Sequence, residues 1–168
     1  MDESTLDAFV RSTYPRLVAA VALISGSRAS AEDAVQEALA RAWERGERGE
    51  HIESVPAWVT TVAVNLARSG VRRVIAERRA RSRLGTREPP MPSPEEFVDL
   101  RRALERLPRR QREAIVLRYY LGLDVGAIAD AMRAPTGTVK SLLSRGRTTL
   151  AAALRIDERE EVDQGDRA

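Results

Sequence analysis

Residues 107–150 constrain the fold of this chain most, because their pattern predicts three helices, the last two arranged as a helix-turn-helix. Asp124 is a suitable N-cap for the first helix of that motif. The apolar side of this helix is formed by Val125, Ile128, Ala129 and Met132. Residues 133–135 make the turn, since Pro135 cannot continue a helix. Thr136 is then expected to cap the second helix.

The second helix of this motif has two unlike sides. Its apolar side carries Val139, Leu142, Leu143, Gly146 and Leu150. The opposite side carries Gly137, Ser141, Ser144 and Thr148, flanked by Lys140, Arg145 and Arg147. Small residues allow close approach of the backbone, hydroxyl groups bond phosphates or bases, and arginines do either. This side suits a helix that enters the DNA major groove, although a solvated face of a small helical bundle has the same pattern.

Charge is distributed unevenly along the chain, although the net charge is only +3. Residues 61–87 carry eight basic side chains and one acidic one, and residues 108–155 carry nine basic and three acidic ones. The first 60 residues are acidic, with ten acidic and six basic side chains. Two basic blocks predict two surfaces that face nucleic acid, with an acidic N-terminal surface left for another partner. The alternative is that the arginine-rich helices are simply solvated.

The rest of the pattern is helical, so the expected fold class is all-α. Helices are predicted over residues 4–24 with a kink or break at Pro15, after an N-cap at Ser30, and from Ser54 into an arginine-rich tract. Trp43 is expected to face inward in the second of these. A further helix is predicted over residues 94–107. Its inward residues are expected to be Phe97, Leu100, Leu104 and Leu107.

Four prolines within residues 84–94 predict a linker, because proline prevents helix and favours extended backbone. The predicted organisation is two small helical domains joined by this Pro-rich linker. The N-terminal domain covers residues 1–84, the linker 85–94, and the helix-turn-helix domain 95–156. A polar tail at residues 157–168 is expected to be frayed or disordered.

Several functional classes are disfavoured. The chain has no cysteine and one histidine, so neither a thiolate site nor a multi-histidine metal site is expected. It also lacks a phosphate-cradling glycine loop and a catalytic triad, so no catalytic residues and no cofactor are expected. No apolar run approaches transmembrane length, and the N-terminus is acidic, unlike a signal peptide. We therefore expect no membrane insertion and a cytoplasmic location.

Two sets of residues carry a resemblance to a known family. In the C-terminal half they are residues 107–113 (LPRRQRE), 117–120 (LRYY), 128–129 and 137–141 (GTVKS). In the N-terminal half they are residues 31–37 (AEDAVQE), 41–43 (RAW), Trp58 and 65–68 (NLAR). In this order, over about residues 5–155, the motifs resemble a bacterial RNA polymerase sigma factor of the two-domain extracytoplasmic-function (ECF) group. The Arg- and Ala-rich composition is similar to actinobacterial members.

The resemblance implies a non-catalytic specificity subunit that binds core RNA polymerase and directs promoter recognition and transcription initiation. The implied partners are core polymerase and promoter DNA, both duplex and opened strand, with an anti-sigma factor as a further candidate. The linker would thread toward the active-site channel and RNA exit path of the polymerase.

The resemblance also implies roles for individual residues. Those implied to dock on core polymerase are Asp33, Gln36, Glu37 and Arg41. Those implied to contact the minus-ten element are Asn65, Arg68, Arg72 and Arg73, while the loop of residues 46–53 would receive a base flipped from the opened strand. Those implied to read the minus-thirty-five element are Thr136, Gly137, Thr138, Lys140, Ser141, Ser144, Arg145, Arg147 and Thr148.

Three residues depart from the family pattern. Arg133 stands where the turn usually has a glycine, and a non-glycine residue in a left-handed conformation costs about 1 kcal/mol. The turn is therefore expected to be strained or reshaped. Gly126 and Gly70 stand where acidic residues are usual, and each weakens its helix.

Two other functions remain open from the sequence. The first is a helix-turn-helix regulator that binds duplex operators as a dimer without polymerase, but the motif of residues 33–43 would have no use there. The second is a sigma-like protein that docks without reading promoters, which the unusual turn at Arg133 keeps open.

Overall fold

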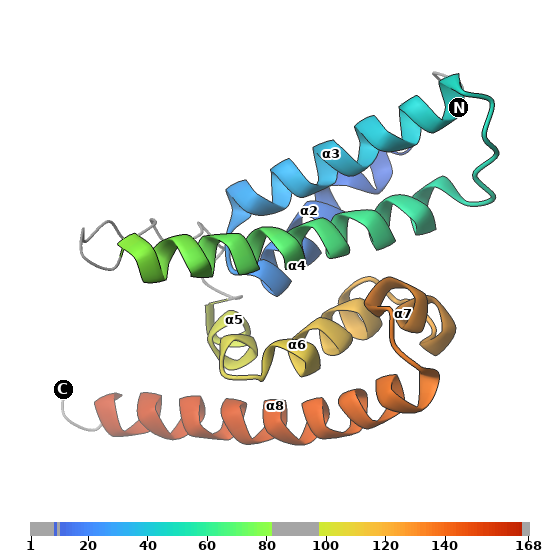
Figure 1. Cartoon of the computed structure of the whole chain (residues 1–168). Coiled ribbons are helices and arrows are strands. Elements are labelled where there is room, and N and C mark those ends of the chain that lie inside the picture. The colour runs from blue at the N-terminus through green and yellow to red at the C-terminus, as the bar shows by residue number, and fades with distance from the viewer. Residues whose placement is uncertain (1–8, 10, 82–97, 166–168) are drawn as a thin grey trace. The chain divides into compact units, whose positions relative to one another are not determined.

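The computed structural model describes residue 9, residues 11–81 and residues 98–165, with side chains described up to residue 69 and over residues 99–155. Within these stretches every regular element is a helix (Figure 1), which confirms the all-α fold class. The helices form two compact units whose main boundary lies between Met91 and Pro92. The predicted linker at residues 85–94 lies outside the described residues.

The N-terminal unit consists of α2 (Tyr14–Ser25), α3 (Arg28–Glu47) and α4 (Val55–Arg81), which pack against one another. In Figure 1, α3 and α4 lie side by side and are joined at one end by the loop of residues 48–54. Pro15 lies in the first turn of α2, directly after a turn at Thr13, so the predicted break is confirmed. A proline fits there because the first N–H groups of a helix have no partner within it.

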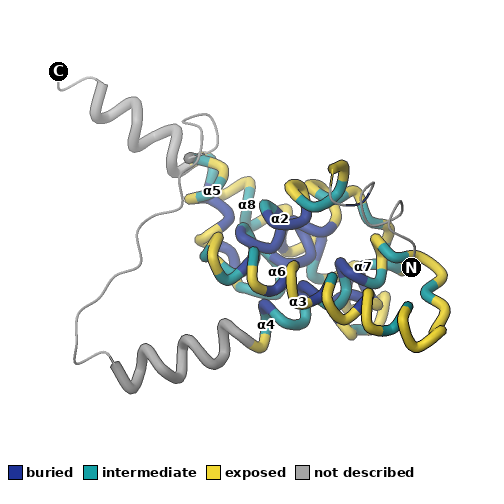
Figure 2. The backbone as a smooth tube through the Cα atoms, turned by 90° about the horizontal axis from the view of Figure 1, so that it is seen from above, coloured by how far each residue is buried: buried dark blue, intermediate teal, exposed yellow. Residues whose placement is uncertain are grey.

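The core of this unit is rich in alanine. Each of its three helices has buried segments, drawn dark blue in Figure 2. The buried apolar residues of α3 and of the described part of α4 are Ala31, Ala34, Val35, Ala38, Ala42, Val59, Ala63, Val64 and Ala67. They recur at three and four residues, which places them on one side of each helix. Small side chains along these stripes let the helices approach closely, and they leave the other side of α3 to charged residues.

Three predictions for this unit are wrong. The N-cap of α3 is Ser27, whose hydroxyl accepts a hydrogen bond from the Ser30 N–H at 3.2 Å, so Ser30 lies inside the helix. Trp43 is 39% exposed, because the neighbouring Ala42 occupies the buried position of that turn. The helix also continues to Glu47, so the first two residues of the predicted loop 46–53 are helical.

The C-terminal unit consists of α5 (Val98–Glu105), α6 (Arg109–Ile115), a π-helical turn (Val116–Tyr120), α7 (Val125–Met132) and α8 (Thr136–Gly165). Both α5 and α6 pack against α8. Leu104 and Leu107 are buried as predicted, whereas Leu100 is 38% exposed and that prediction is wrong. Ala103 is buried beside Leu104, so the buried side of α5 is turned away from Leu100. Phe97 lies outside the described residues.

The contact between α6 and α8 depends on the absence of a side chain at Gly146. A Cβ placed there would lie 2.7 Å from Cγ1 of Ile115, closer than real Cβ contacts. Three residues further along α8, the Thr149 hydroxyl lies 3.1 Å from Oε1 of Gln111 on α6 and donates to it. A glycine and a polar contact thus fix the register of the two helices.

Two features of this unit differ from the prediction. Helix α8 continues to Gly165, where a frayed or disordered tail was expected. Residues 147–164 contain neither glycine nor proline and are rich in alanine, glutamate and arginine, all strong helix formers. The π-helical turn was also missed. Within it the Leu121 N–H donates to the Val116 carbonyl at 3.2 Å, and Gly122 follows with a φ of +76°.

Candidate nucleic-acid interface

The helix-turn-helix is closed by local hydrogen bonds at each end of α7. At its start, Oδ1 of Asp124 accepts a hydrogen bond from the Ala127 N–H at 2.8 Å, which confirms the predicted N-cap. At its end, the Arg133 N–H donates to the Asp130 carbonyl at 3.1 Å and the Ala134 N–H donates to the Ala129 carbonyl at 3.0 Å. This pair of bonds is the Schellman arrangement, which places its C′ residue in the left-handed region. Arg133 occupies that position with a φ of +48°.

Helix α8 begins one residue earlier than predicted. Thr136 is its first helical residue rather than its cap. The preceding Pro135 supplies the carbonyl that accepts the first helical hydrogen bond, from the Val139 N–H at 3.1 Å. Pro135 has no N–H of its own to satisfy, so it fits the position before a helix.

The two sides of α8 are divided as the sequence predicts. Val139, Leu143 and Gly146 are buried, and Leu142 and Leu150 are half-buried. All nine residues predicted to read DNA from this helix are exposed: Thr136, Gly137, Thr138, Lys140, Ser141, Ser144, Arg145, Arg147 and Thr148. The helix therefore presents hydroxyl groups, three cations and a glycine to the exterior of its unit.

Tyr119 extends this side of α8 and was missed by the sequence analysis. Its ring is 59% exposed, and its hydroxyl accepts a hydrogen bond from Nη1 of Arg147 at 3.3 Å. Further along α8, an open depression is lined by Arg147, Thr148, Ala151, Ala152 and Arg155. Arg155 thus extends the cationic side two turns beyond the predicted set.

On α4, two of the four residues predicted to contact the minus-ten element lie together. Asn65 and Arg68 are half-exposed one turn apart, and Nη1 of Arg68 lies 3.4 Å from Oδ1 of Asn65. The Asn65 side chain also donates to the Thr61 carbonyl at 2.7 Å. Arg72 and Arg73 belong to α4, but their side chains lie outside the described residues.

The four residues predicted to dock on polymerase form an exposed face of α3. Asp33, Gln36, Glu37 and Arg41 are all exposed. Nε of Arg41 and Oε1 of Glu37 form an ion pair at 2.8 Å with the i,i+4 spacing of a helix surface. The exposed Trp43 follows Gln36 by seven residues, two helical turns, and so lies on the same side of α3.

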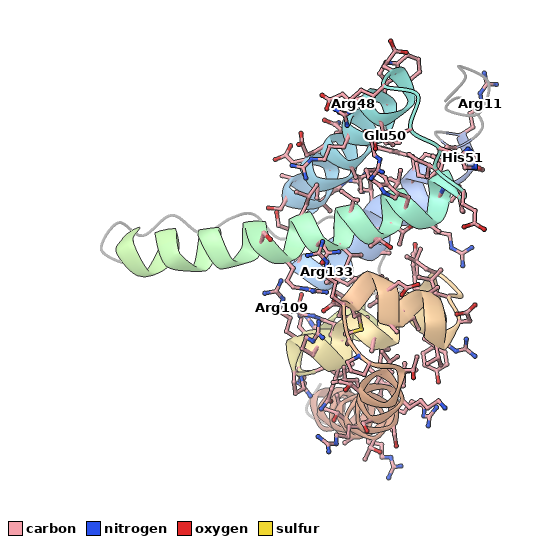
Figure 3. The ribbon with its side chains drawn as sticks, turned by 45° about the vertical axis from the view of Figure 1, so that its right-hand side comes forward. Arg11, Arg48, Glu50, His51, Arg109 and Arg133 are labelled. Atoms are coloured by element: carbon pink, nitrogen blue, oxygen red, sulfur yellow. The ribbon has the colours of Figure 1, made fainter. Side chains whose placement is uncertain are left out.

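The loop between α3 and α4 is organised around Glu50, which the sequence analysis did not single out. Its carboxylate pairs with Nη2 of Arg45 at 2.7 Å and with Nε of Arg48 at 3.0 Å. Arg48 and Glu50 lie together in Figure 3, beside His51 in the same loop. The hydrogen bond from Arg48, together with the charge of Arg45, lowers the pKa of Glu50 despite an opposing effect of desolvation.

Other kinds of site are not found in the part of the chain that the structure describes. No three histidine, cysteine or carboxylate side chains there are grouped closely enough to hold a metal ion. None of its described helices is both long and apolar enough to cross a membrane.

Comparison with known proteins accounts for both halves of the chain. Residues 9–79 match the family "Sigma-70 region 2" and residues 97–150 match "Sigma-70, region 4". The ECF RNA polymerase sigma factor EcfG of Rhodopseudomonas palustris is 31% identical over 163 residues, which cover 94% of this chain and 89% of that protein. This chain belongs to the ECF-type sigma factors of the sigma-70 family. It is accordingly a non-catalytic subunit that binds RNA polymerase and recognises promoters.

Other relatives agree with this assignment. The ECF RNA polymerase sigma factor SigL of Mycobacterium tuberculosis is 34% identical over 134 residues, covering 71% of this chain and 72% of SigL. Among solved structures, the sigma factor RpoE of Bartonella quintana, in complex with the anti-sigma factor NepR, matches with a TM-score of 0.76 and 27% identity. That match covers 91% of this sigma factor and 98% of RpoE.

Proposed function

We propose that this sigma factor divides promoter recognition among three exposed faces. The exposed face of α3 docks on core polymerase, α4 and the α3–α4 loop read the minus-ten element, and α8 reads the minus-thirty-five element. The domains that carry these roles are residues 1–84 and 95–156, joined by the linker 85–94. The single observation that carries the proposal is the exposed hydroxyl and cationic side of α8, directly opposite its buried apolar side.

The chemistry of α8 supports duplex recognition. Lys140 and Arg145 are exposed cations within the first three turns of α8, the N-terminal part through which recognition helices contact base edges. Ser141 and Ser144 supply hydroxyl groups next to them, and Gly137 leaves space for close approach to the backbone of DNA. Arginine bonds two acceptors of guanine at once, whereas lysine and serine are equally suited to phosphates.

A randomised promoter library tests this role. Core polymerase with this factor would be offered templates randomised at both promoter elements, and transcribed templates would be sequenced. Arg145→Ala is expected to reduce use of the preferred upstream sequence by about tenfold or more, the usual effect of losing a base or phosphate contact. Lys140→Ala is expected to act in the same direction. Arg102→Ala, which removes an exposed arginine from α5, is the matched control. An upstream preference that Arg145→Ala and Lys140→Ala leave unchanged would contradict the role of α8.

The minus-ten role rests on Asn65 and Arg68, with Arg72 and Arg73 further along α4. Amide and guanidinium groups one turn apart can bond a base edge and a phosphate of the same strand. The loop between α3 and α4 is proposed to receive a flipped base. Few aromatic side chains are available as a stacking platform, so base capture and phosphate contacts would carry most of the recognition.

The docking role rests on the charged face of α3 and on Trp43. Exposed aromatic residues are enriched at the centres of protein interfaces, where they contribute much of the binding energy. The exposed Trp43 lies at the edge of the face formed by Asp33, Gln36, Glu37 and Arg41. Its exposure favours a role of this face in binding a protein over a face that is only solvated. The acidic balance of the first 60 residues disfavours DNA as the partner of this face.

Three further assignments are part of the proposal. RpoE of Bartonella quintana was solved with an anti-sigma factor, which supports an anti-sigma partner for this chain as well. Action on promoter DNA within a polymerase supports a cytoplasmic location. The arginine- and alanine-rich composition supports an actinobacterial origin, and the mycobacterial relatives agree with it, although EcfG comes from Rhodopseudomonas.

The two alternatives are weakened by separate observations. A stand-alone regulator would not need a region 2 domain, whereas residues 9–79 of this chain match sigma-70 region 2. A sigma-like protein that reads no promoter was kept open by Arg133. That residue adopts the left-handed conformation which the turn requires, and both closing hydrogen bonds are present.

A further inference from the structure

We infer that Glu50 is a positioning residue for minus-ten recognition: its carboxylate fixes the α3–α4 loop in the conformation that discriminates between bases. The inference rests on the proposed function of this loop. It concerns the Glu50 clamp, which we define as Arg45, Arg48, Glu50 and Trp58.

The clamp joins the end of α3 to the loop by side-chain and backbone bonds. The two carboxylate oxygens of Glu50 pair separately, Oε2 with Nη2 of Arg45 at 2.7 Å and Oε1 with Nε of Arg48 at 3.0 Å. The Glu50 N–H donates to the Arg45 carbonyl at 3.0 Å. Between them, Gly49 turns the chain with a φ of +73°, which a side chain would disfavour.

The clamp also reaches the start of α4. The guanidinium of Arg45 lies over the ring of Trp58, with its central carbon 5.5 Å from the ring centroid, a cation–π distance. Trp58 is half-buried in the second turn that follows the loop. One carboxylate and one arginine therefore connect three elements: the last turn of α3, the loop, and the first turns of α4.

The segment that the clamp positions is the one best placed to contact a base. His51, Ile52 and Glu53 follow Glu50 directly, and His51 and Glu53 are exposed. Figure 3 shows Glu50 and His51 at the end of the unit where α3 and α4 are joined. Exposed ion pairs are individually weak, so the loop is not locked by charge alone. Two pairs that share one carboxylate nevertheless favour one loop conformation before DNA arrives, which is how preorganised sites gain selectivity.

Glu50→Gln keeps the size of the side chain and removes the charge on which both pairs depend. Glu47→Gln is the matched control, because it makes the same change in net charge at an exposed residue in the last turn of α3, outside both the clamp and the loop of residues 48–54. Arg48→Gln is a second test that removes one of the two pairs. Each full-length variant would be combined with core polymerase and offered the library randomised at both promoter elements.

We expect Glu50→Gln to reduce the base preference in the minus-ten element by about 3- to 10-fold, the scale expected when two weak ion pairs on one carboxylate are lost. The minus-thirty-five preference from the same pool should be unchanged, and Glu47→Gln should leave both preferences unchanged. Arg48→Gln should give a smaller loss at minus-ten. An unchanged minus-ten preference in Glu50→Gln would overturn the inference and leave the proposed function standing. A wild-type factor with no minus-ten preference would instead remove the proposed function, and the inference with it.

A fluorescence measurement tests the clamp without DNA. The chain has two tryptophans, so Trp43→Phe leaves Trp58 as the only one. In that background Glu50→Gln should increase quenching of Trp58 by acrylamide, since Arg45 is no longer held over the ring, and Glu47→Gln should not. Equal quenching in all three proteins would show that Glu50 does not position Arg45, and would overturn the inference.

Discussion

Among the residues that the structure describes, Arg133 is the one residue other than glycine with a positive φ. Its φ of +48° is imposed by the Schellman arrangement that ends α7, and three residues separate α7 from α8. The sequence predicts a strained or reshaped turn here, and the structure shows a strained one: the turn keeps its hydrogen bonds and the arginine adopts the left-handed conformation.

Replacing this residue should therefore stabilise the protein. We expect Arg133→Gly to stabilise the fold by about 0.5–1 kcal/mol, because relief of the left-handed conformation is partly offset by the greater freedom of glycine in the unfolded chain. Urea denaturation followed by circular dichroism would measure the change. Ala134→Gly, at a neighbour without a positive φ, should destabilise and serves as the control. A lower denaturation midpoint for Arg133→Gly would contradict the account of the turn.

The pKa of Glu50 gives a second prediction for a single residue. The bond from Arg48 and the charge of Arg45 lower the pKa below the value near 4.5 of an unperturbed glutamate. The stabilisation by the clamp is then fully present above the unfolded pKa and is lost as the pH falls through the lower, folded pKa. Quenching of Trp58 in the Trp43→Phe background should thus change with a midpoint below pH 4.5. If Glu50→Gln showed the same pH transition in Trp58 quenching, the transition could not come from the Glu50 carboxylate.

At the level of the helix, Gly146 sets how closely α6 and α8 approach. Gly146→Ala would place a methyl group against Ile115. We expect destabilisation of about 1–2 kcal/mol, because the overpacking cost outweighs the gain in helix propensity. Gly137→Ala in the same helix has open space around it and should instead be neutral or stabilising. The midpoints of thermal unfolding of the two variants test this prediction. A Gly146→Ala variant more stable than the wild type would show that α6 and α8 can move apart without loss of stability.

The charged face of α3 gives a prediction about polymerase binding. Asp33→Arg combined with Glu37→Arg should abolish co-purification with core polymerase, because two exposed carboxylates on the proposed docking face become cations. The Glu37 change also places like charges beside Arg41, so a small loss of helix stability is expected. An unchanged circular dichroism spectrum would confirm that the unit remains folded. Normal co-purification of the double variant would contradict the docking role.

The elements were predictable where one side of a helix is clearly apolar. The order of α6, α7 and α8, the turn at residues 133–135 and the exposed side of α8 all followed from periodicity and caps. Cap positions were less secure, since Ser27 and Ser30 are both good capping residues and only the fold selects between them. Trp43 and Leu100 were placed inside because they are large and apolar, but alanines beside them fill the buried positions.

At the scale of the whole molecule, the two-domain organisation and the function followed from two motif sets in a fixed order. The contacts that position the site residues could not be predicted from those motifs. The Glu50 clamp depends on a turn at Gly49 that brings three charged side chains and a tryptophan together. Nothing in the local sequence distinguishes Glu50 from Glu47 or Glu53, so only the folded loop identifies it.

The most direct test of the central claim is run-off transcription from pooled genomic DNA of the source organism, with core polymerase alone and with core polymerase plus this chain. Promoter recognition by this sigma factor predicts new, discrete start sites that share two upstream sequence elements and appear only when the chain is added. Stable binding to core polymerase without any new start site would contradict promoter recognition. Failure to bind core polymerase at all would contradict the docking role as well.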